Sequence, residues 1–159
     1  MWTGNTVVHN IYKEGMEWIN ARLKRKTYIW WNYPVSDFVR DRMLLGPTYG
    51  NDLDIADLMS GFVSNPMQYA ESSKVSLYSV ADYTWNMAAY DWKASWERAI
   101  KDLLPSEASA LRTFAMYNED LGPNGHGFRR DEGREMAENC RPSEKMPLPH
   151  QMRSRSCPG

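Results

Sequence analysis

Residues Tyr28–Asp37 read Y-I-W-W-N-Y-P-V-S-D, and this stretch decides how the rest of the sequence is interpreted. Its first four residues form a continuous apolar, aromatic run, which is typical of a β-strand that is buried on both faces. The run ends at Asn32, and a polar segment with a proline follows it. A buried strand that delivers aromatic and polar side chains into a loop builds one wall of a ligand pocket in many barrels. A core strand followed by an ordinary turn fits the same residues, so both interpretations stay open at this point.

The same pattern occurs a second time further along the chain. Residues 61–64, G-F-V-S, predict a short strand, and Asn65 and Pro66 follow it directly. Asn32 and Asn65 would then lie at equivalent ends of neighbouring strands. The repetition predicts a pocket that the two carboxamides share.

Helical spacing of apolar residues precedes and follows these strands. The segment 11–23 predicts a helix that leads through a short link into the strand at 28–31, which is half of a parallel α/β unit. In 74–85, Leu77, Tyr78, Ala81 and Trp85 recur at helical offsets, although an alternation beginning at Val75 leaves a strand open. One or two helical turns are expected within 54–59.

Two further helices are predicted before residue 119. Asp91 is the expected N-cap of an amphipathic helix that runs to Leu104, and Pro105 ends it. Ser106 is the expected N-cap of the next helix, which fades near residue 118. Its apolar side chains at positions 111, 114 and 115 are expected to face inward.

Length, charge and composition limit the classes of function. A chain of 159 residues makes one domain or a large piece of one. Its formal net charge of −1 predicts neither a nucleic-acid partner nor an anionic membrane surface, and no apolar run has the length of a membrane span. The first residues carry no signal core, and the chain is expected to begin in mid-domain.

The composition changes near residue 133. From there to residue 159 the chain has four prolines, scattered charges and no aromatic residue. We therefore expect a folded domain over 1–132 and an irregular or disordered tail over 133–159.

Familiar catalytic and metal motifs are absent from the sequence. It holds no nucleophile elbow, phosphate-binding loop, zinc-protease motif or dinucleotide fingerprint, and its three histidines are widely separated. Asn51-Asp52-Leu53-Asp54 faintly resembles a calcium loop, but the required glycine and glutamate are missing. We expect no metal ion and no cofactor.

The remaining candidates form a carbohydrate-type constellation. Trp30 supplies an aromatic face, while Asn32, Asp37 and Asn65 supply groups that hydrogen-bond to sugar hydroxyls. Tyr33 and His126 are weaker candidates. Each residue also has a structural interpretation, which is a cap or turn for the polar ones and core packing for Trp30.

Five motifs carry a resemblance to a known family. The sequence resembles bacterial enzymes of glycoside hydrolase family 84, the β-N-acetylglucosaminidases also called O-GlcNAcases and, in older usage, hyaluronidases, over residues 1–132. The motifs are W-W-N-Y-P-V-S-D, L-L-G-P-T-Y-G-N-D, M-S-G-F-V-S-N-P-M, A-E-S-S-K and D-L-G-P-N-G-H-G-F-R-R.

The resemblance implies the C-terminal portion of a (β/α)8 barrel, with the end of the sixth strand at residues 2–4, the seventh strand at 28–31 and the eighth at 62–64. It implies that Asn32, Asp37 and Asn65 contact an N-acetylglucosamine ring. It places Trp30 at the acetamido pocket, with Thr3 and Val7 near it. His126 stays in the predicted substrate-binding set as a candidate of the constellation above.

The resemblance also implies substrate-assisted hydrolysis, in which the 2-acetamido oxygen attacks the anomeric carbon to form an oxazoline. The adjacent Asp-Asp pair that assists this reaction lies after the fourth strand in the family, and the sequence contains no such pair. We therefore assign no catalytic residue and expect the isolated chain to be inactive. The expected partner is an N-acetylglucosamine-containing glycoside or glycoprotein, and a non-catalytic carbohydrate-binding or interaction module is the alternative. Family members are often secreted or periplasmic, but the sequence leaves the location unassigned because any signal would lie upstream.

Overall fold

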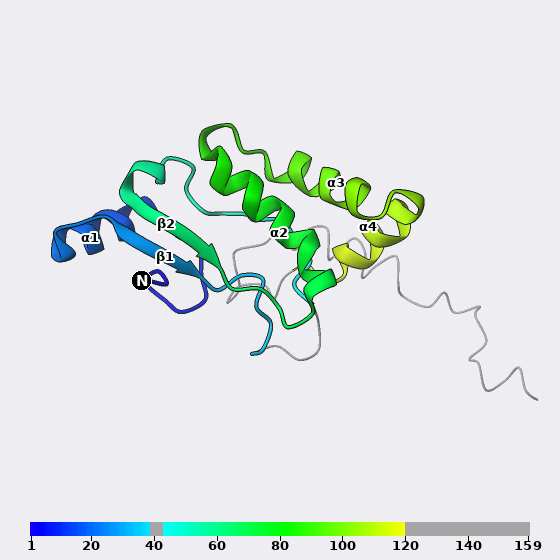
Figure 1. The fold of residues 1–159 in the computed structure, drawn as a ribbon, viewed down its shortest axis with the longest axis horizontal. Coiled ribbons are helices and arrows are strands. Elements are labelled where there is room, and N and C mark those ends of the chain that lie inside the picture. The colour runs from blue at the N-terminus through cyan, green and yellow to red at the C-terminus, as the bar shows by residue number, and fades with distance from the viewer. Residues whose placement is uncertain (39–42, 120–159) are drawn as a thin grey trace, which may run out of the picture.

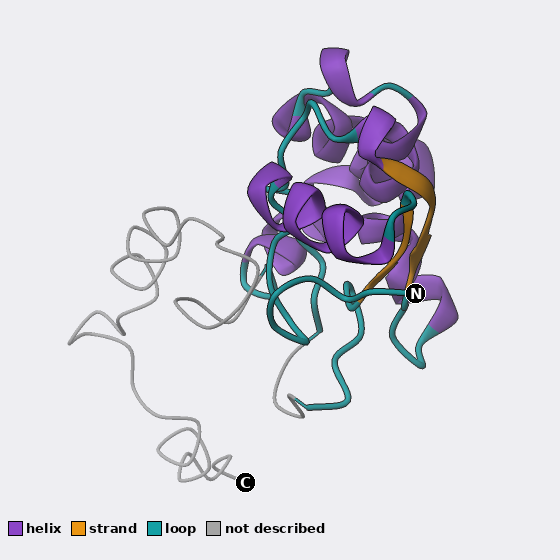
Figure 2. Cartoon of the chain, turned by 90° about the vertical axis from the view of Figure 1, so that its left-hand side faces the viewer, coloured by secondary structure: helices purple, strands orange, loops and turns teal. Residues whose placement is uncertain are grey.

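A computed structural model of the chain describes residues 1–38 and 43–119, and it combines helices with two short parallel strands (Figures 1 and 2). The elements are, in chain order, α1 (Lys13–Leu23), β1 (Thr27–Trp31), η1 (Ala56–Leu58), β2 (Met59–Ser64), α2 (Ala70–Trp85), η2 (Met87–Ala89), α3 (Trp92–Leu103), η3 (Pro105–Glu107) and α4 (Ala108–Met116), where η marks a 3-10 helix. The predicted tail at 133–159 and the candidate His126 lie outside the described residues.

The strands form a parallel sheet, as the sequence predicts. β1 pairs with β2 in a register that sets Tyr28 beside Gly61 and Trp31 beside Ser64. Trp2 lies along the other edge of β1: its N–H donates to the carbonyl of Tyr28, and its carbonyl accepts from the N–H of Trp30, both at 2.9 Å. Three parallel segments therefore lie side by side, in the order residue 2, β1, β2.

Helix α1 confirms the helix predicted before β1. Met16 is fully buried against the sheet, and Lys24, in the left-handed conformation with φ of 55°, ends the helix. Tyr12 and Leu23, which share the apolar spacing, remain 42% and 45% exposed. The helix thus buries a narrower stripe than its sequence pattern indicates.

Helix α2 settles the choice between helix and strand at 74–85, but its buried face differs from the expected one. Trp85 is 93% exposed, whereas Ser73, Ser76 and Ser79 are almost completely buried. Ser76 and Ser79 face the chain segment before η1, where Ser76 Oγ donates to the carbonyl of Leu44 at 2.6 Å and Ser79 Oγ accepts from the N–H of Thr48 at 2.7 Å. Ser73 Oγ donates to the carbonyl of Met67, after β2, at 3.3 Å. Hydrogen bonds to backbone groups therefore allow a serine face to be buried.

The N-cap of α3 is confirmed, and that of α4 is wrong. Asp91 Oδ1 accepts from the backbone N–H groups of Lys93 and Ala94 at 2.9 and 3.0 Å. Ser106 instead lies within η3 and makes no cap, because a 3-10 turn starting at Pro105 precedes α4. On α4, Ala115 is buried as expected, but Phe114 is 49% exposed.

Two apolar clusters form the core. The first lies around the sheet and includes Ile29, Trp31 and Tyr83; the second joins α2, α3 and α4 through Val75 and Trp96, among others. The clusters flank residues 43–52, which Trp96 anchors by donating its indole N–H to the carbonyl of Leu45 at 2.8 Å. None of the helices within residues 1–38 and 43–119 has the length and apolar character needed to cross a membrane.

Candidate functional site

The two predicted carboxamides meet at the carboxyl ends of β1 and β2. Asn32 follows β1 and Asn65 follows β2, and the register that pairs Trp31 with Ser64 sets them side by side. Asn65 Nδ2 donates to Asn32 Oδ1 at 3.1 Å, and the backbone N–H of Asn65 donates to the carbonyl of Trp31 at 2.9 Å. Sheet pairing therefore continues into the segment that presents both side chains.

Trp30 and the segment near residue 7 complete this cluster. Trp30 Nε1 donates to the same Asn32 Oδ1 at 2.8 Å, since residues two apart on a strand point to the same face. Asn32 Nδ2 donates to the carbonyl of Val7 at 2.7 Å. Val7 thus contributes its backbone to the cluster, while its side chain is 69% exposed. We call Val7, Trp30, Asn32 and Asn65 the carboxamide cluster.

The hydrogen bonds of Asn32 fix what the cluster offers to a ligand. Its Oδ1 accepts two hydrogen bonds, which is the full capacity of a carbonyl oxygen. Of its two amide hydrogens, one donates to Val7 and the other is left to donate to a ligand. The indole N–H of Trp30 is also occupied, so Trp30 presents ring surface rather than a donor. Among the described residues, no hydrogen bond reaches Asn65 Oδ1, which leaves an acceptor at the edge of the cluster.

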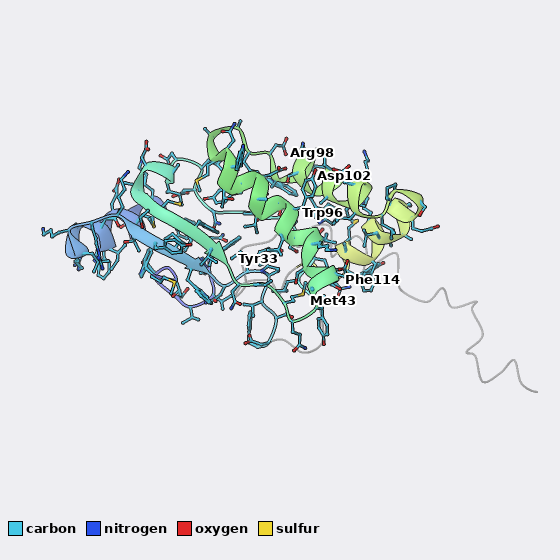
Figure 3. The ribbon with its side chains drawn as sticks, in the orientation of Figure 1. Tyr33, Met43, Trp96, Arg98, Asp102 and Phe114 are labelled. Atoms are coloured by element: carbon cyan, nitrogen blue, oxygen red, sulfur yellow. The ribbon has the colours of Figure 1, made fainter. Side chains whose placement is uncertain are left out.

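The loops beyond the strands hold the cluster in place. Val35 N–H donates to the carbonyl of Asn65 at 2.9 Å, and Ser64 Oγ donates to the carbonyl of Tyr33. Tyr33 itself is fully buried and donates its hydroxyl to the carbonyl of Gly46 at 2.6 Å. Figure 3 shows Tyr33 just beyond the arrowheads of β1 and β2. The interpretation of Tyr33 as a ligand-facing residue is therefore wrong, because its ring fills the core.

The other predicted site residues are not hydrogen-bonded to the carboxamide cluster within the described residues. Thr3 is partly buried and Asp37 is exposed, and within residues 1–38 and 43–119 neither forms a hydrogen bond to the carboxamide cluster. Only Phe38 separates Asp37 from positions 39–42, which the structure does not describe, and His126 lies outside the described ranges. Their roles remain predictions.

The segment that faintly resembles a calcium loop holds backbone groups instead. Asn51 Oδ1 accepts from the N–H of Ile11 at 2.9 Å, and Asp52 Oδ2 accepts from the N–H of Lys13 at 2.7 Å, at the start of α1. In the part of the chain that the structure describes, no three His, Cys, Asp or Glu side chains gather as a metal site requires. The sequence pattern around Asn51 gave no sign of these contacts, because they join residues about 40 positions apart.

Comparisons with known proteins agree with the motif resemblance. A family model described as beta-N-acetylglucosaminidase matches residues 1–116. Among solved structures, CpGH84B is 36% identical over 76% of this chain with a TM-score of 0.73, and CpGH84D is 35% identical over 87% with a TM-score of 0.76. A mutant of the O-GlcNAc hydrolase of Thermobaculum terrenum is 32% identical over 74% with a TM-score of 0.70.

The matched region is a minor part of each relative. The chain spans 22% of CpGH84B, 24% of CpGH84D and 26% of the Thermobaculum terrenum hydrolase. The family assignment nevertheless has three consistent supports: the sequence motifs, the family match over most of the chain, and these structures. The chain belongs to the β-N-acetylglucosaminidases of glycoside hydrolase family 84.

Proposed function

We propose that residues 1–132 are the C-terminal part of a (β/α)8 catalytic barrel, and that the carboxamide cluster belongs to its N-acetylglucosamine subsite. One observation supports this most directly: Asn32 and Asn65 hydrogen-bond to each other just beyond the carboxyl ends of two parallel strands. Active sites of such barrels lie at that end of the strands. The parallel segment at Trp2 beside β1 extends the same sheet.

The chemistry of the cluster suits a neutral sugar. Trp30 would offer an aromatic face to the acetamido group, Asn65 Oδ1 would accept from a hydroxyl, and the free N–H of Asn32 would donate to a ring substituent. Asp37 is proposed to accept from sugar hydroxyls, with Thr3, Val7 and His126 completing the walls. The ligand class is a terminal N-acetylglucosamine in a glycoside or glycoprotein.

The reaction proposed for the complete site is substrate-assisted hydrolysis through an oxazoline. The residues of this chain would hold the sugar and shield the acetamido group while that group attacks the anomeric carbon. Proton transfer to the leaving oxygen requires an acid, and the sequence has no adjacent Asp-Asp pair to supply it. General acid–base catalysis contributes about 10²–10⁴-fold per step, so the chain alone should bind sugar without cleaving it.

The experiment combines an activity assay with a binding assay on the 159-residue chain. We expect no turnover of a chromogenic β-N-acetylglucosaminide, together with saturable binding of N-acetylglucosamine that Asn65→Ala weakens. Glu107→Ala, on an exposed turn far along the chain, is the matched control and should leave binding unchanged. Turnover at the rate of a complete family enzyme would overturn the proposed division of roles. Binding unaffected by Asn65→Ala would show that the cluster is not the subsite.

A further inference from the structure

The backbone pairing between the two strands is interrupted where the carboxamide cluster begins. In a regular parallel ladder, a residue donates its N–H to one residue of the neighbouring strand, and its carbonyl accepts from the residue two positions later. Asn65 donates to the carbonyl of Trp31 but accepts from the N–H of Val35, both at 2.9 Å. Val35 lies four positions after Trp31, so the chain that follows β1 carries two residues more than regular pairing needs.

The extra residues change how the chain after β1 is held. Such an insertion is a form of β-bulge, and bulges beside binding sites redirect side chains and interrupt the ladder. Pairing to Asn65 resumes only at Val35, so it passes over Asn32 and Tyr33. These two residues are buried, at 8% and 0% exposed, and Asn32 carries the central side chain of the carboxamide cluster. The position of this side chain therefore depends on contacts other than regular sheet pairing.

Ser64 provides a contact across the interruption. It is the last residue of β2 and lies opposite Trp31 in the register. Its Oγ donates to the carbonyl of Tyr33, within the inserted segment. A carbonyl in a fully buried residue needs a hydrogen-bond donor, and the hydroxyl of Ser64 supplies one. Ser64 thereby fastens the inserted segment to the end of β2.

This bond joins the chain neighbours of the two carboxamides. Ser64 directly precedes Asn65, and Tyr33 directly follows Asn32. Asn65 Nδ2 reaches Asn32 Oδ1 at 3.1 Å, which is near the long end of the range for such bonds. A small displacement of Asn32 and Tyr33 away from β2 would therefore break the contact between the carboxamides. The hydrogen bond from Ser64 opposes that displacement.

We propose that Ser64 is a positioning residue of the N-acetylglucosamine subsite, whose hydroxyl holds Asn32 within reach of Asn65. Successive side chains of a strand point to opposite faces, so the Ser64 side chain points away from the side of Asn65 and does not itself contact the sugar. Its effect on sugar binding rests on the proposed function of the carboxamide cluster. Its effect on the position of Asn32 is independent of that function and can be measured without a ligand.

The first test follows the indole N–H of Trp30 by NMR. This group donates to Asn32 Oδ1 at 2.8 Å, so its signal reports the position of Asn32, and its absence from Trp30→Phe identifies it. Ser64→Thr and Ser64→Val introduce side chains of the same shape, of which only threonine keeps the hydroxyl. We expect Ser64→Val to move the signal towards that of an unbonded indole, whereas Ser64→Thr should keep the natural position.

The second test titrates the 159-residue chain with N-acetylglucosamine. Ser64→Val should weaken binding about tenfold, because the carboxamides lose their mutual position, and Ser64→Thr should retain the natural affinity. Ser95→Ala is the matched control, since Ser95 is fully buried and its Oγ donates to Asp82 Oδ2 at 2.6 Å, between α3 and α2. It removes one buried serine hydrogen bond outside the cluster, so it should lower stability while leaving the indole signal and the affinity unchanged.

Ser64→Ala adds no bulk and should behave as Ser64→Val does, so the comparison does not depend on a larger side chain folding. An unchanged indole signal in Ser64→Ala, or an equal change in Ser64→Thr and Ser64→Val, would overturn the inference. An equal loss of affinity in Ser95→Ala would also overturn it, since the effect would then come from stability in general. If the natural chain binds no N-acetylglucosamine, the proposed function is contradicted, and the indole signals alone decide the role of Ser64.

Discussion

Asn65 donates its carboxamide N–H to Oδ1 of Asn32 at 3.1 Å, although 33 positions separate the two residues in the sequence. The register of β1 and β2 creates this contact, and Asn32 extends it by also accepting from Trp30 and donating to the carbonyl of Val7. Asn32 therefore connects three chain segments, whereas Asn65 contributes one side-chain bond to the cluster. The two asparagines should differ in their effect on stability.

Asn32→Ala should lower the free energy of unfolding by about 2–3 kcal/mol, because it leaves the N–H of Trp30, the N–H of Asn65 and the carbonyl of Val7 without a partner. Asn65→Ala is the matched variant and should cost about 1 kcal/mol, since Asn32 Oδ1 keeps its bond from Trp30. Urea denaturation measures the loss of unfolding free energy in both variants. Equal losses would contradict the central position of Asn32.

The two predicted helix caps offer a second comparison. Asp91→Ala should destabilise the chain by about 1 kcal/mol, because Asp91 Oδ1 accepts two backbone N–H bonds at the start of α3. Ser106→Ala should change stability by less than about 0.5 kcal/mol, since η3 replaces the expected cap. Thermal denaturation of the two variants side by side decides the point, and a larger loss for Ser106→Ala would show that the cap assignment is reversed.

Gly61 is constrained by the ring of its cross-strand neighbour. A Cβ added to Gly61 would lie 2.4 Å from Cε2 of Tyr28, which sits directly opposite in the sheet. Gly61→Ala should therefore cost about 1–2 kcal/mol, as the ring must leave its place.

The same substitution in a Tyr28→Ala chain should cost nothing or stabilise, because alanine has the higher strand propensity and the ring is gone. The double-mutant cycle should yield a coupling of about 1 kcal/mol or more. Additive effects would mean that the ring moves aside freely, as its 41% exposure would permit.

The buried tyrosines predict a loss of stability in alkaline solution. Burial raises the pKa of Tyr83 above its value of about 10 in the unfolded chain. The unfolded state therefore releases its proton first, so the stabilising contribution is complete below about pH 10 and is lost as the pH rises further. The slope approaches about 1.4 kcal/mol per pH unit for one such group.

Tyr83→Phe should make this decline shallower, because the ring can no longer ionise. Tyr69→Phe, which changes a side chain that is 53% exposed, is the control and should leave the decline as it is. Urea denaturation between about pH 8 and pH 11 measures the slopes. Parallel curves for the natural chain and Tyr83→Phe would contradict the prediction.

Part of the fold could be predicted from the sequence because the signals are local. The apolar run at 28–31 forms β1, the run before Asn65 forms β2, and apolar spacing of 3.6 produces α1 and α3. The expectation that β1 is buried on both faces is wrong, because Ile29 and Trp31 are buried on one face whereas Tyr28 on the other is 41% exposed. Asp91 caps α3 through groups two and three residues away, so its role is visible in the sequence. The contact of Asn32 with Asn65 also follows from a local pattern, since two similar strands that pair in parallel bring their following residues together.

Long-range contacts determine the burial of side chains that local patterns do not predict. The buried serines of α2 look like a solvent-facing side in sequence, but the carbonyls of Met67 and Leu44 and the N–H of Thr48 supply their hydrogen bonds. Tyr33 looks like a pocket residue, but the carbonyl of Gly46 draws its hydroxyl into the core.

Local sequence patterns are thus sufficient for β1, β2 and the amphipathic helices α1 and α3, because periodicity and propensity act within one segment. Contacts between distant segments decide which polar groups are paired and which have no partner within the described residues, such as Asn65 Oδ1 at the edge of the cluster and the buried Asn51 Nδ2. They do so because a hydrogen-bond partner tens of residues away leaves no trace in the local sequence pattern.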